Sequence, residues 1–278
     1  MLDKITEKSP AKINLFLKII KKREDGFHNI RSGITFVDLY DDITVTPNNT
    51  FGVIYSGIFA PKNNIFDDCI IKKLFKFLKK DPPKLLFSIS KNFPYQAGLG
   101  SASSNVATVI KILENLELIE KKNIFDYVDL GSDIPFFLHQ KDCLIRGKGD
   151  LIANILFPKY YFLIIQPTFN CSTKEMYKSF KETDFDYSTE FDVDDINDQD
   201  VGNDFEKILQ KKESEFSLLI NYLNTLDGVI FSRLTGSGSC IFSVFEKKDE
   251  AKSAQKEFTG KFPLLWTCIA QNNVINLF

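Results

Sequence analysis

The 278-residue sequence contains only two histidines, His28 and His139, and so offers little material for a Ser-His-Asp triad or a histidine-rich metal site. Its five cysteines are odd in number and far apart, at Cys69, Cys143, Cys171, Cys240 and Cys268. This spacing fits neither a disulfide framework nor a zinc site, so we expect buried free thiols in a reducing cytoplasm. No apolar run approaches the roughly 20 residues of a membrane-spanning helix, and we expect no membrane partner.

The sequence also lacks an excess of charge of either sign. The formal net charge is −2, and the lysines form no basic stripe, so we expect no nucleic acid as a partner. The first residues carry charges at Asp3, Lys4, Glu7 and Lys8 and no apolar segment, which argues against a secretory signal. The length is sufficient for one large domain or two smaller ones.

A loop rich in small residues connects a predicted strand to a predicted helix near the middle of the chain. It reads Pro94-Tyr95-Gln96-Ala97-Gly98-Leu99-Gly100-Ser101-Ala102-Ser103-Ser104. Apolar residues alternate over 85–90 before it and recur at helical spacing over 106–116 after it. Its glycines permit close approach of a ligand, and free N–H groups and serine hydroxyls at a helix start suit phosphate. A turn followed by a well-capped helix is the alternative, and spacing alone does not separate the two.

The N-terminal region is predicted to begin with a strand over residues 9–19. Alternation along it places Lys12 and Asn14 on one face at its start. Lys12 is either a site residue or an ordinary exposed lysine, and base rates favour the second. Two further strands, over 34–39 and 42–46, complete a predicted meander.

An Asp25-Gly26 pair predicts a hairpin turn between the first two strands. Phe27 and His28 follow the turn directly, where an aromatic pair could line a pocket. A purely structural aromatic at the start of a strand is the alternative.

Asp133 is a carboxylate among apolar neighbours, after a Gly-Ser turn and two residues before Pro135. The position suits a helix cap, and it also suits a catalytic carboxylate held at a helix start. The residues themselves favour the cap.

The second half of the chain is predicted to begin near residue 150 and to contain strands and helices in turn. The stretch 182–200 is strongly acidic, its spacing fits no EF-hand, and a mobile loop is the ordinary interpretation. A second glycine-serine loop, 234–240, precedes a strand. Antiparallel strands mixed with helices indicate an α+β fold.

Three segments, in order and at suitable separations, resemble the motifs of the GHMP kinases. They are Pro10-Ala11-Lys12-Ile13-Asn14-Leu15, the loop from Pro94 to Ser104, and Leu234-Thr235-Gly236-Ser237-Gly238-Ser239-Cys240. Within that family, three more segments are most similar to members that phosphorylate 4-diphosphocytidyl-2-C-methyl-D-erythritol. These are Asp25-Gly26-Phe27-His28, Leu130-Gly131-Ser132-Asp133-Ile134-Pro135-Phe136 and Asn203-Asp204-Phe205-Glu206. The likeness runs nearly from end to end.

The resemblance implies a two-domain α+β fold with the active site in the cleft between the domains. Residues 1–150 would form the N-terminal ATP-binding domain and 151–278 the C-terminal substrate-binding domain, with a final strand near 270–278 able to pack back on the first. The cofactor would be ATP with Mg²⁺, and the residues that bind the metal are not identified.

The resemblance also implies roles for individual residues. Lys12 and Asp133 match the catalytic pair. The ATP-binding positions are Asn64 and Ile65 at the adenine, Lys91 more loosely, and Pro94, Tyr95, Gln96, Ala97, Gly98, Leu99, Gly100, Ser101, Ala102, Ser103 and Ser104 around the triphosphate. The substrate-binding positions are Asn14, Phe27, His28, Thr173 and Tyr177, with the cytosine ring between Phe27 and Tyr177.

The implied reaction is in-line phosphorylation of the 2-hydroxyl of a cytidine-diphosphate-linked methylerythritol, a step of the non-mevalonate route to isopentenyl diphosphate. Asp133 would accept the hydroxyl proton, and Lys12 would keep that carboxylate ionised. Gln96 and Phe27 depart from the family pattern, and Gln96 could crowd the phosphates. A homoserine or mevalonate type of kinase and a non-catalytic binding protein of the same fold are the alternatives.

Overall fold

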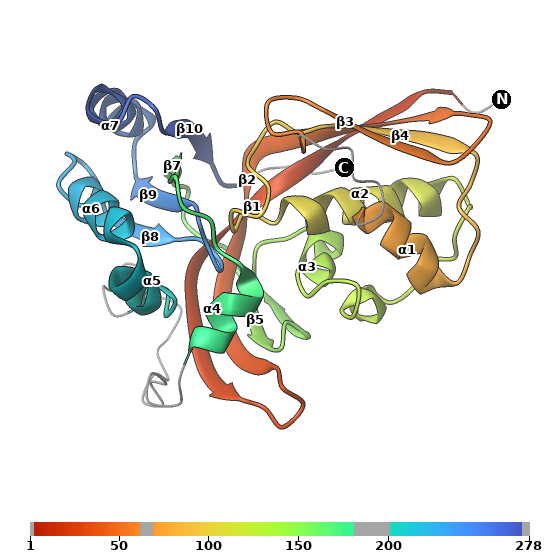
Figure 1. Cartoon of the computed structure of the whole chain (residues 1–278), viewed down its shortest axis with the longest axis horizontal. Helices are drawn as coiled ribbons and strands as arrows, with labels where there is room; N and C mark the ends of the chain where they lie inside the picture. The colour runs from red at the N-terminus through yellow and green to blue at the C-terminus, as the bar shows by residue number, and fades with distance from the viewer. Residues whose placement is uncertain (1–2, 62–68, 181–200, 274–278) are drawn as a thin grey trace.

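The computed structural model describes residues 3–61, 69–180 and 201–273. The predicted adenine contacts Asn64 and Ile65 and the whole of the acidic stretch 182–200 lie outside these ranges. The described chain forms two antiparallel or mixed β-sheets with helices packed against them (Figure 1). This arrangement confirms the predicted α+β class.

The first sheet has six strands and contains a long hairpin. Its path is β3-β4-β2-β5-β6, and β1 pairs with β2. The strands are β1 Ile5–Lys22, β2 His28–Pro47, β3 Gly52–Ser56, β4 Leu85–Ser90, β5 Cys143–Gly147 and β6 Leu151–Asn154. The turn between β1 and β2 contains Gly26, as predicted, and the two long strands run through the centre of the molecule (Figure 1).

The two strands predicted over 34–39 and 42–46 are one strand, β2, and the separate-strand prediction is wrong. Pro10 pairs with Tyr40 whereas the next residue, Ala11, pairs with Val37. Two residues of β2 are therefore bulged out of register. The bulge interrupts the alternation of side chains, which made one strand look like two.

Helices α1, α2 and α3 and one 3₁₀ helix accompany the first sheet. They are α1 Ile70–Leu78, α2 Ser101–Asn115, η2 Ile124–Tyr127 and α3 Ile134–His139. The apolar side of α2, including Val109 and Ile110, shares a core with Phe36, Phe87 and Phe136. Phe36 and Phe136 stack with their ring centroids 4.3 Å apart, which fixes α3 against β2.

The second sheet has the order β10-β7-β9-β8 and is wholly antiparallel. Its strands are β7 Tyr161–Gln166, β8 Phe231–Leu234, β9 Ile241–Phe245 and β10 Trp266–Gln271, and its helices are α4 Thr173–Ser179, α5 Glu206–Lys212, α6 Ser214–Leu223 and α7 Lys248–Lys261. Strand β8 was not predicted. The chain passes from the first sheet to the second between β6 and β7, and a domain division near residue 150 stays a prediction.

A buried cluster joins the two sheets. It unites Ile13 and Leu15 of β1 and Leu99 of the small-residue loop with Phe162 and Phe242 of the second sheet. Polar contacts reinforce it. Arg233 of β8 donates to the Leu15 carbonyl at 2.9 Å, and Glu206 of α5 accepts from the Leu234 N–H at 2.7 Å.

Glu206 is expected to make stability fall as pH rises. Burial raises the pKa of its carboxyl to about 7 from an ordinary value of 4.5, so the folded chain holds the proton more tightly than the unfolded chain. The free energy of unfolding should therefore decrease from pH 5 to pH 8, by on the order of 2 kcal/mol. Glu206→Gln removes this titration, so the melting temperature of the variant should rise relative to that of the wild type as the pH increases. Calorimetry at both pH values tests this, with the exposed Glu120→Gln as control. If the melting temperatures of the wild type and Glu206→Gln change equally between the two pH values, this prediction is wrong.

Candidate active site

Lys12 lies near the middle of β1 with a side chain only 4% exposed. Its Nζ contacts the Asn14 side-chain oxygen and lies 3.9 Å from Asp133 Oδ2. Burial lowers the pKa of Lys12, and the charge of Asp133 opposes part of that shift. The interpretation of Lys12 as an ordinary exposed lysine is therefore wrong, while the predicted shared face of Lys12 and Asn14 is confirmed.

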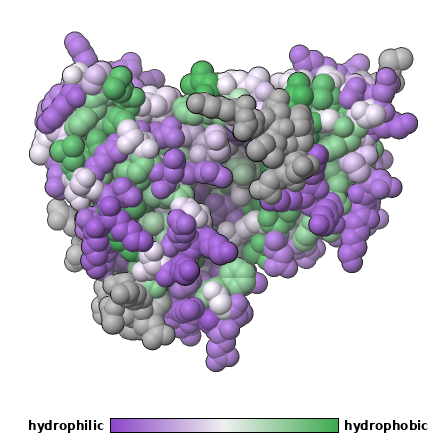
Figure 2. Space-filling model, viewed as in Figure 1, coloured by the Kyte–Doolittle hydropathy of each residue, from purple (hydrophilic) through white to green (hydrophobic). Residues whose placement is uncertain are grey.

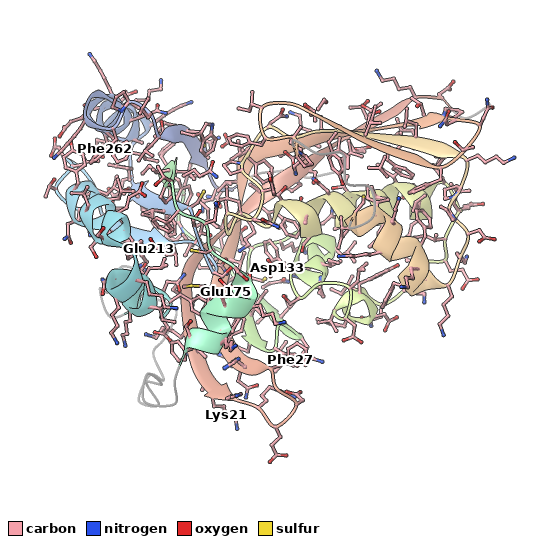
Figure 3. The ribbon with its side chains drawn as sticks, viewed as in Figure 1. Lys21, Phe27, Asp133, Glu175, Glu213 and Phe262 are labelled. Atoms are coloured by element: carbon pink, nitrogen blue, oxygen red, sulfur yellow. The ribbon has the colours of Figure 1, made fainter. Side chains whose placement is uncertain are left out.

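Asp133 occupies the N-cap position of α3, but its carboxylate makes no capping hydrogen bond. Pro135 stands in the first turn of that helix and needs no hydrogen-bond acceptor there. The Asp133 side chain is 39% exposed and lies in the centre of the molecule beside α4 (Figure 3). The capping interpretation is thus wrong for the side chain, and the carboxylate remains open to a ligand.

The small-residue loop meets the N-terminus of α2, as predicted. Gly98 and Gly100 have φ of 81° and 76°, a region that glycine adopts without strain. Gln96 has φ of 55° in the same region although it carries a side chain. The first N–H groups of α2 have no partner within the helix and provide positive potential for an anion. The Lys12 N–H donates to the Leu99 carbonyl at 3.1 Å, which holds the loop against β1.

Two of the three serine hydroxyls expected at this anion site face the protein interior. Ser104 Oγ donates to the Pro10 carbonyl at 2.6 Å, and the Ser101 hydroxyl contacts the Lys91 ammonium. Both hydroxyls are therefore already used, and the Ser104 N–H donates to the Gly100 carbonyl at 2.9 Å, so of these two residues only Ser101 can offer a phosphate its backbone N–H. Ser103 is the partly exposed one of the three.

Lys91 is buried in a hydrogen-bonded ion pair. Its Nζ contacts Asp41 Oδ2 and Ser101 Oγ and lies 2.9 Å from Asn105 Oδ1. Asp41 also accepts from the N–H of Asn92 at 2.8 Å. The three donors of the ammonium are thus used within the protein, and the Asp41 carboxylate ties both ends of the small-residue loop together. A contact of Lys91 with the nucleotide stays a prediction, and this geometry gives it no support.

The second glycine-serine loop packs directly on the first. A Cβ at Gly98 would overlap the Thr235 carbonyl oxygen. The Thr235 hydroxyl donates to the Gly98 carbonyl at 3.2 Å and accepts from the Asn14 N–H at 3.0 Å. The N–H of Cys240 donates to the Ala97 carbonyl at 3.0 Å. Both loops therefore meet beside Lys12, and the three predicted motifs form one site.

Helix α4 brings the predicted substrate contacts to the same site. Ser172 caps it by accepting from the Glu175 N–H, and the hydroxyls of Thr173 and Ser237 lie 2.7 Å apart. The Tyr177 ring stacks on His28, with centroids 5.0 Å apart and planes 25° from parallel. Burial, and secondarily the charge of Asp133, raises the pKa of the Tyr177 hydroxyl, which places this ring close to that carboxylate.

Phe27 lies apart from this aromatic pair. It is 55% exposed on the β1–β2 turn, and the Lys148 ammonium lies 5.4 Å from its ring centroid (Figure 3). The ring that stacks on Tyr177 in this structure is that of His28. The predicted sandwich of a pyrimidine between Phe27 and Tyr177 is untested.

Sequence reasoning missed three residues that build the site. Thr235 was included only as part of a motif, and its two hydrogen bonds depend on chain segments more than 130 residues away. Asp41 gave no local signal at all. Asn203 stood in a noted motif without a role, although its side chain donates to the carbonyls of Leu234 and Gly236.

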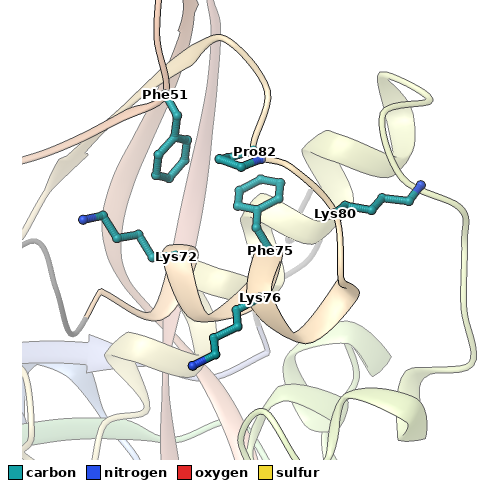
Figure 4. Close-up of a pocket in the computed structure, with 6 residues that line it drawn as sticks. All are labelled: Phe51, Lys72, Phe75, Lys76, Lys80 and Pro82. Carbon is teal, nitrogen blue, oxygen red and sulfur yellow. The ribbon is translucent and has the colours of Figure 1, made fainter.

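The surface is hollowed between the two halves of the molecule, with hydrophilic residues around the hollow (Figure 2). A separate pocket of about 320 Å³ lies at α1 and is lined by Phe51, Lys72, Phe75, Lys76, Lys80 and Pro82 (Figure 4). None of those six residues belongs to either glycine loop or to the Lys12–Asp133 pair. We therefore assign the site to the junction of the loops.

Within residues 3–61, 69–180 and 201–273, no helix has the length and apolar character needed to cross a bilayer. The same ranges contain no group of three or more His, Cys, Asp and Glu side chains placed to hold a metal ion. A magnesium ion that arrives with a nucleotide needs only one or two protein carboxylates, so the exposed Asp133 carboxylate fits it.

Comparison with known proteins places the chain among kinases. The model for the N-terminal domain of GHMP kinases matches residues 69–141, and the model for their C-terminal domain matches residues 195–264. A 4-diphosphocytidyl-2-C-methyl-D-erythritol kinase of Francisella tularensis subsp. holarctica is 35% identical over 265 residues, covering 90% of each chain. One of Pelagibacter ubique is 33% identical over 281 residues, covering 96% of this chain and 98% of its own.

A solved structure of 4-(cytidine 5'-diphospho)-2C-methyl-D-erythritol kinase has the same fold, with a TM-score of 0.78 at 22% identity, covering 97% of this chain and 100% of its own. The site and the fold thus define an ATP-dependent kinase that acts on a small molecule. The chain belongs to the GHMP kinases, and within them to the family of the 4-diphosphocytidyl-2-C-methyl-D-erythritol kinases.

Replacement of Gly98 tests the contact between the two loops. Gly98→Ala adds a methyl group against the Thr235 carbonyl, whereas Gly26→Ala, at a similar φ of 84°, meets nothing within 4 Å. Both variants share the backbone strain of about 1 kcal/mol, and only the first adds a clash. Gly98→Ala should therefore lose at least about 2 kcal/mol more of unfolding free energy than Gly26→Ala in denaturant titrations. Equal losses would show that the loops do not pack as described.

Proposed function

We propose that this protein transfers the γ-phosphoryl group of ATP to the 2-hydroxyl of 4-diphosphocytidyl-2-C-methyl-D-erythritol, in the non-mevalonate route to isopentenyl diphosphate. The observation that carries the proposal is the Lys12–Asp133 pair. An uncapped carboxylate lies 3.9 Å from a buried ammonium, where two glycine loops meet. The names of the curated relatives support the choice of substrate.

Asp133 is proposed as the base that accepts the proton of the substrate hydroxyl. Its side chain is accessible, and no helix N–H competes for its oxygens. Lys12 keeps this carboxylate ionised and favours negative charge that develops on the transferred group. Asn14 contacts the Lys12 ammonium and, through its own amide, Ser32 Oγ at 2.8 Å, so the lysine head is held in one place.

The triphosphate is proposed to lie along the loop from Pro94 to Ser104. Free N–H groups at the start of α2 would bind its oxygens, because helix N-termini favour anions. Bound Mg²⁺ would neutralise phosphate charge, and the exposed Asp133 is a carboxylate that could serve it. Phosphoryl transfer needs mainly such positioning and charge stabilisation, with no covalent intermediate on the protein.

The cytidine end of the substrate is proposed to bind at His28 and Tyr177. These rings are stacked at the start of β2 and on α4, and they offer flat apolar faces to a pyrimidine. Thr173, on the same helix, adds a hydroxyl next to the second glycine loop. The charge of Asp133 acts on Tyr177, so the base and the ring-binding region lie close together.

A coupled assay of ADP release tests substrate and reaction together. With ATP and Mg²⁺, turnover is expected with 4-diphosphocytidyl-2-C-methyl-D-erythritol and not with homoserine or mevalonate, since only the first carries a pyrimidine. Turnover with either control alcohol would overturn the cytidine assignment. A folded protein that binds ATP and phosphorylates none of the three would overturn the proposed function.

Substitution of the catalytic pair tests the mechanism. Asp133→Asn keeps the shape but cannot accept a proton, so kcat should fall by about 10² to 10⁴. Lys12→Met removes the charge and should lower kcat by about 10² to 10³ with the fold intact. The exposed Asp126→Asn makes the same chemical change elsewhere and should match the wild type. Steady-state kinetics on the wild type and the three variants test these expectations. A wild-type rate for Asp133→Asn would refute the role of Asp133 as base.

A further inference from the structure

The segment Asn203–Glu206 lies between the two sheets and has no role in the chemistry described above. It runs beside β1, where the Asp204 N–H donates to the Leu17 carbonyl at 2.9 Å. Asn203 and Asp204 are each 3% exposed, and Phe205 is fully buried. Asp204 pairs with Lys18 at 2.7 Å and accepts from the Ile19 N–H at 2.7 Å. The segment is therefore fixed firmly to β1.

The amide of Asn203 holds the start of the second glycine loop. Its Nδ2 donates to the Leu234 carbonyl at 2.9 Å and the Gly236 carbonyl at 2.7 Å, and its Oδ1 accepts from the Phe205 N–H at 3.0 Å. A Cβ on Gly236 would lie 3.0 Å from Lys12 Nζ. The same Cβ would lie 3.2 Å from Asn14 Oδ1, so Asn203 fixes the peptide that lies against both the Lys12 ammonium and the Asn14 amide.

The ring of Phe205 supports the aromatic pair on the other side of the site. It meets Tyr177 edge-on, with centroids 4.9 Å apart and planes at 86°. Tyr177 in turn stacks on His28. Because edge-to-face contact constrains the tilt of a ring, Phe205 fixes the orientation in which Tyr177 presents its face.

We propose that Asn203 and Phe205 are positioning residues with separate targets. Asn203 places the Gly236 peptide and through it Lys12 for phosphoryl transfer, and Phe205 places Tyr177 for recognition of the pyrimidine. Asn203 and Phe205 flank Asp204, which holds the segment on β1, and thereby set the distance between the reacting centre and the base-binding rings. This inference rests on the proposed function.

Two single variants separate the two targets. Asn203→Asp keeps the acceptor for the Phe205 N–H and loses both donors, so kcat should fall by about tenfold or more while the dissociation constant of CDP stays within about twofold. Phe205→Leu keeps the core apolar and removes the ring edge. It should raise the dissociation constant of CDP by about fivefold or more while kcat at saturating substrate stays within about threefold. The readouts are steady-state kinetics and calorimetric titration with CDP.

A matched control variant removes a buried hydrogen bond within the second sheet. Ser232 and Ser243 share a hydroxyl contact of 2.8 Å between β8 and β9, so Ser232→Ala should lower the melting temperature without changing kcat or CDP binding. If Asn203→Asp and Phe205→Leu behave like this control, or change kcat and CDP affinity in parallel, the inference is wrong and the proposed function stands. A wild type that neither turns over the cytidyl substrate nor binds CDP would instead remove the proposed function, and the inference with it.

Discussion

The burial of the Lys12 ammonium is the constraint on which the site depends. Burying a cation is costly unless an anion lies against it. Two other buried lysines are fully compensated, since Lys18 lies 2.7 Å from Asp204 and Lys91 is in direct contact with Asp41. The Lys12 ammonium contacts the side-chain amide oxygen of Asn14, and its nearest described carboxylate, that of Asp133, lies 3.9 Å away. Of the three, it is the one that retains attraction for an incoming anion such as a phosphoryl group.

The long β1–β2 hairpin turns this local constraint into an arrangement of the whole molecule. β1 carries Lys12 at the glycine loops and, six residues later, Lys18 at the segment that joins the second sheet. β2 carries His28 at its start and Asp41 in its second half. Because the two strands are paired along their length, the small-residue loop and the His28 ring are held on one hairpin that crosses both halves of the molecule (Figure 1).

Local patterns in the sequence predicted local structure well. The turn at Gly26 and the loop-to-helix junction at Gly100 each depend on a few neighbouring residues, and the structure confirms them. The features that the residues alone did not predict depend on contacts between segments that are far apart in the sequence. The burial of Lys12 requires the second glycine loop, and the pairing of Lys91 with Asp41 spans 50 residues. For Asp133, residue chemistry favoured a cap, and only the family resemblance indicated the free carboxylate that is observed.

Helix α4 explains how recognition of one end of the substrate can govern chemistry at the other. Its first residue, Thr173, meets Ser237 of the second glycine loop, and one turn later Tyr177 meets His28. The Tyr177 hydroxyl is close enough to Asp133 for that charge to raise its pKa. A pyrimidine bound on Tyr177, as proposed, would therefore be anchored on the same short helix that touches the second glycine loop. In that proposal the spacing along α4 would set which hydroxyl of the substrate reaches Asp133.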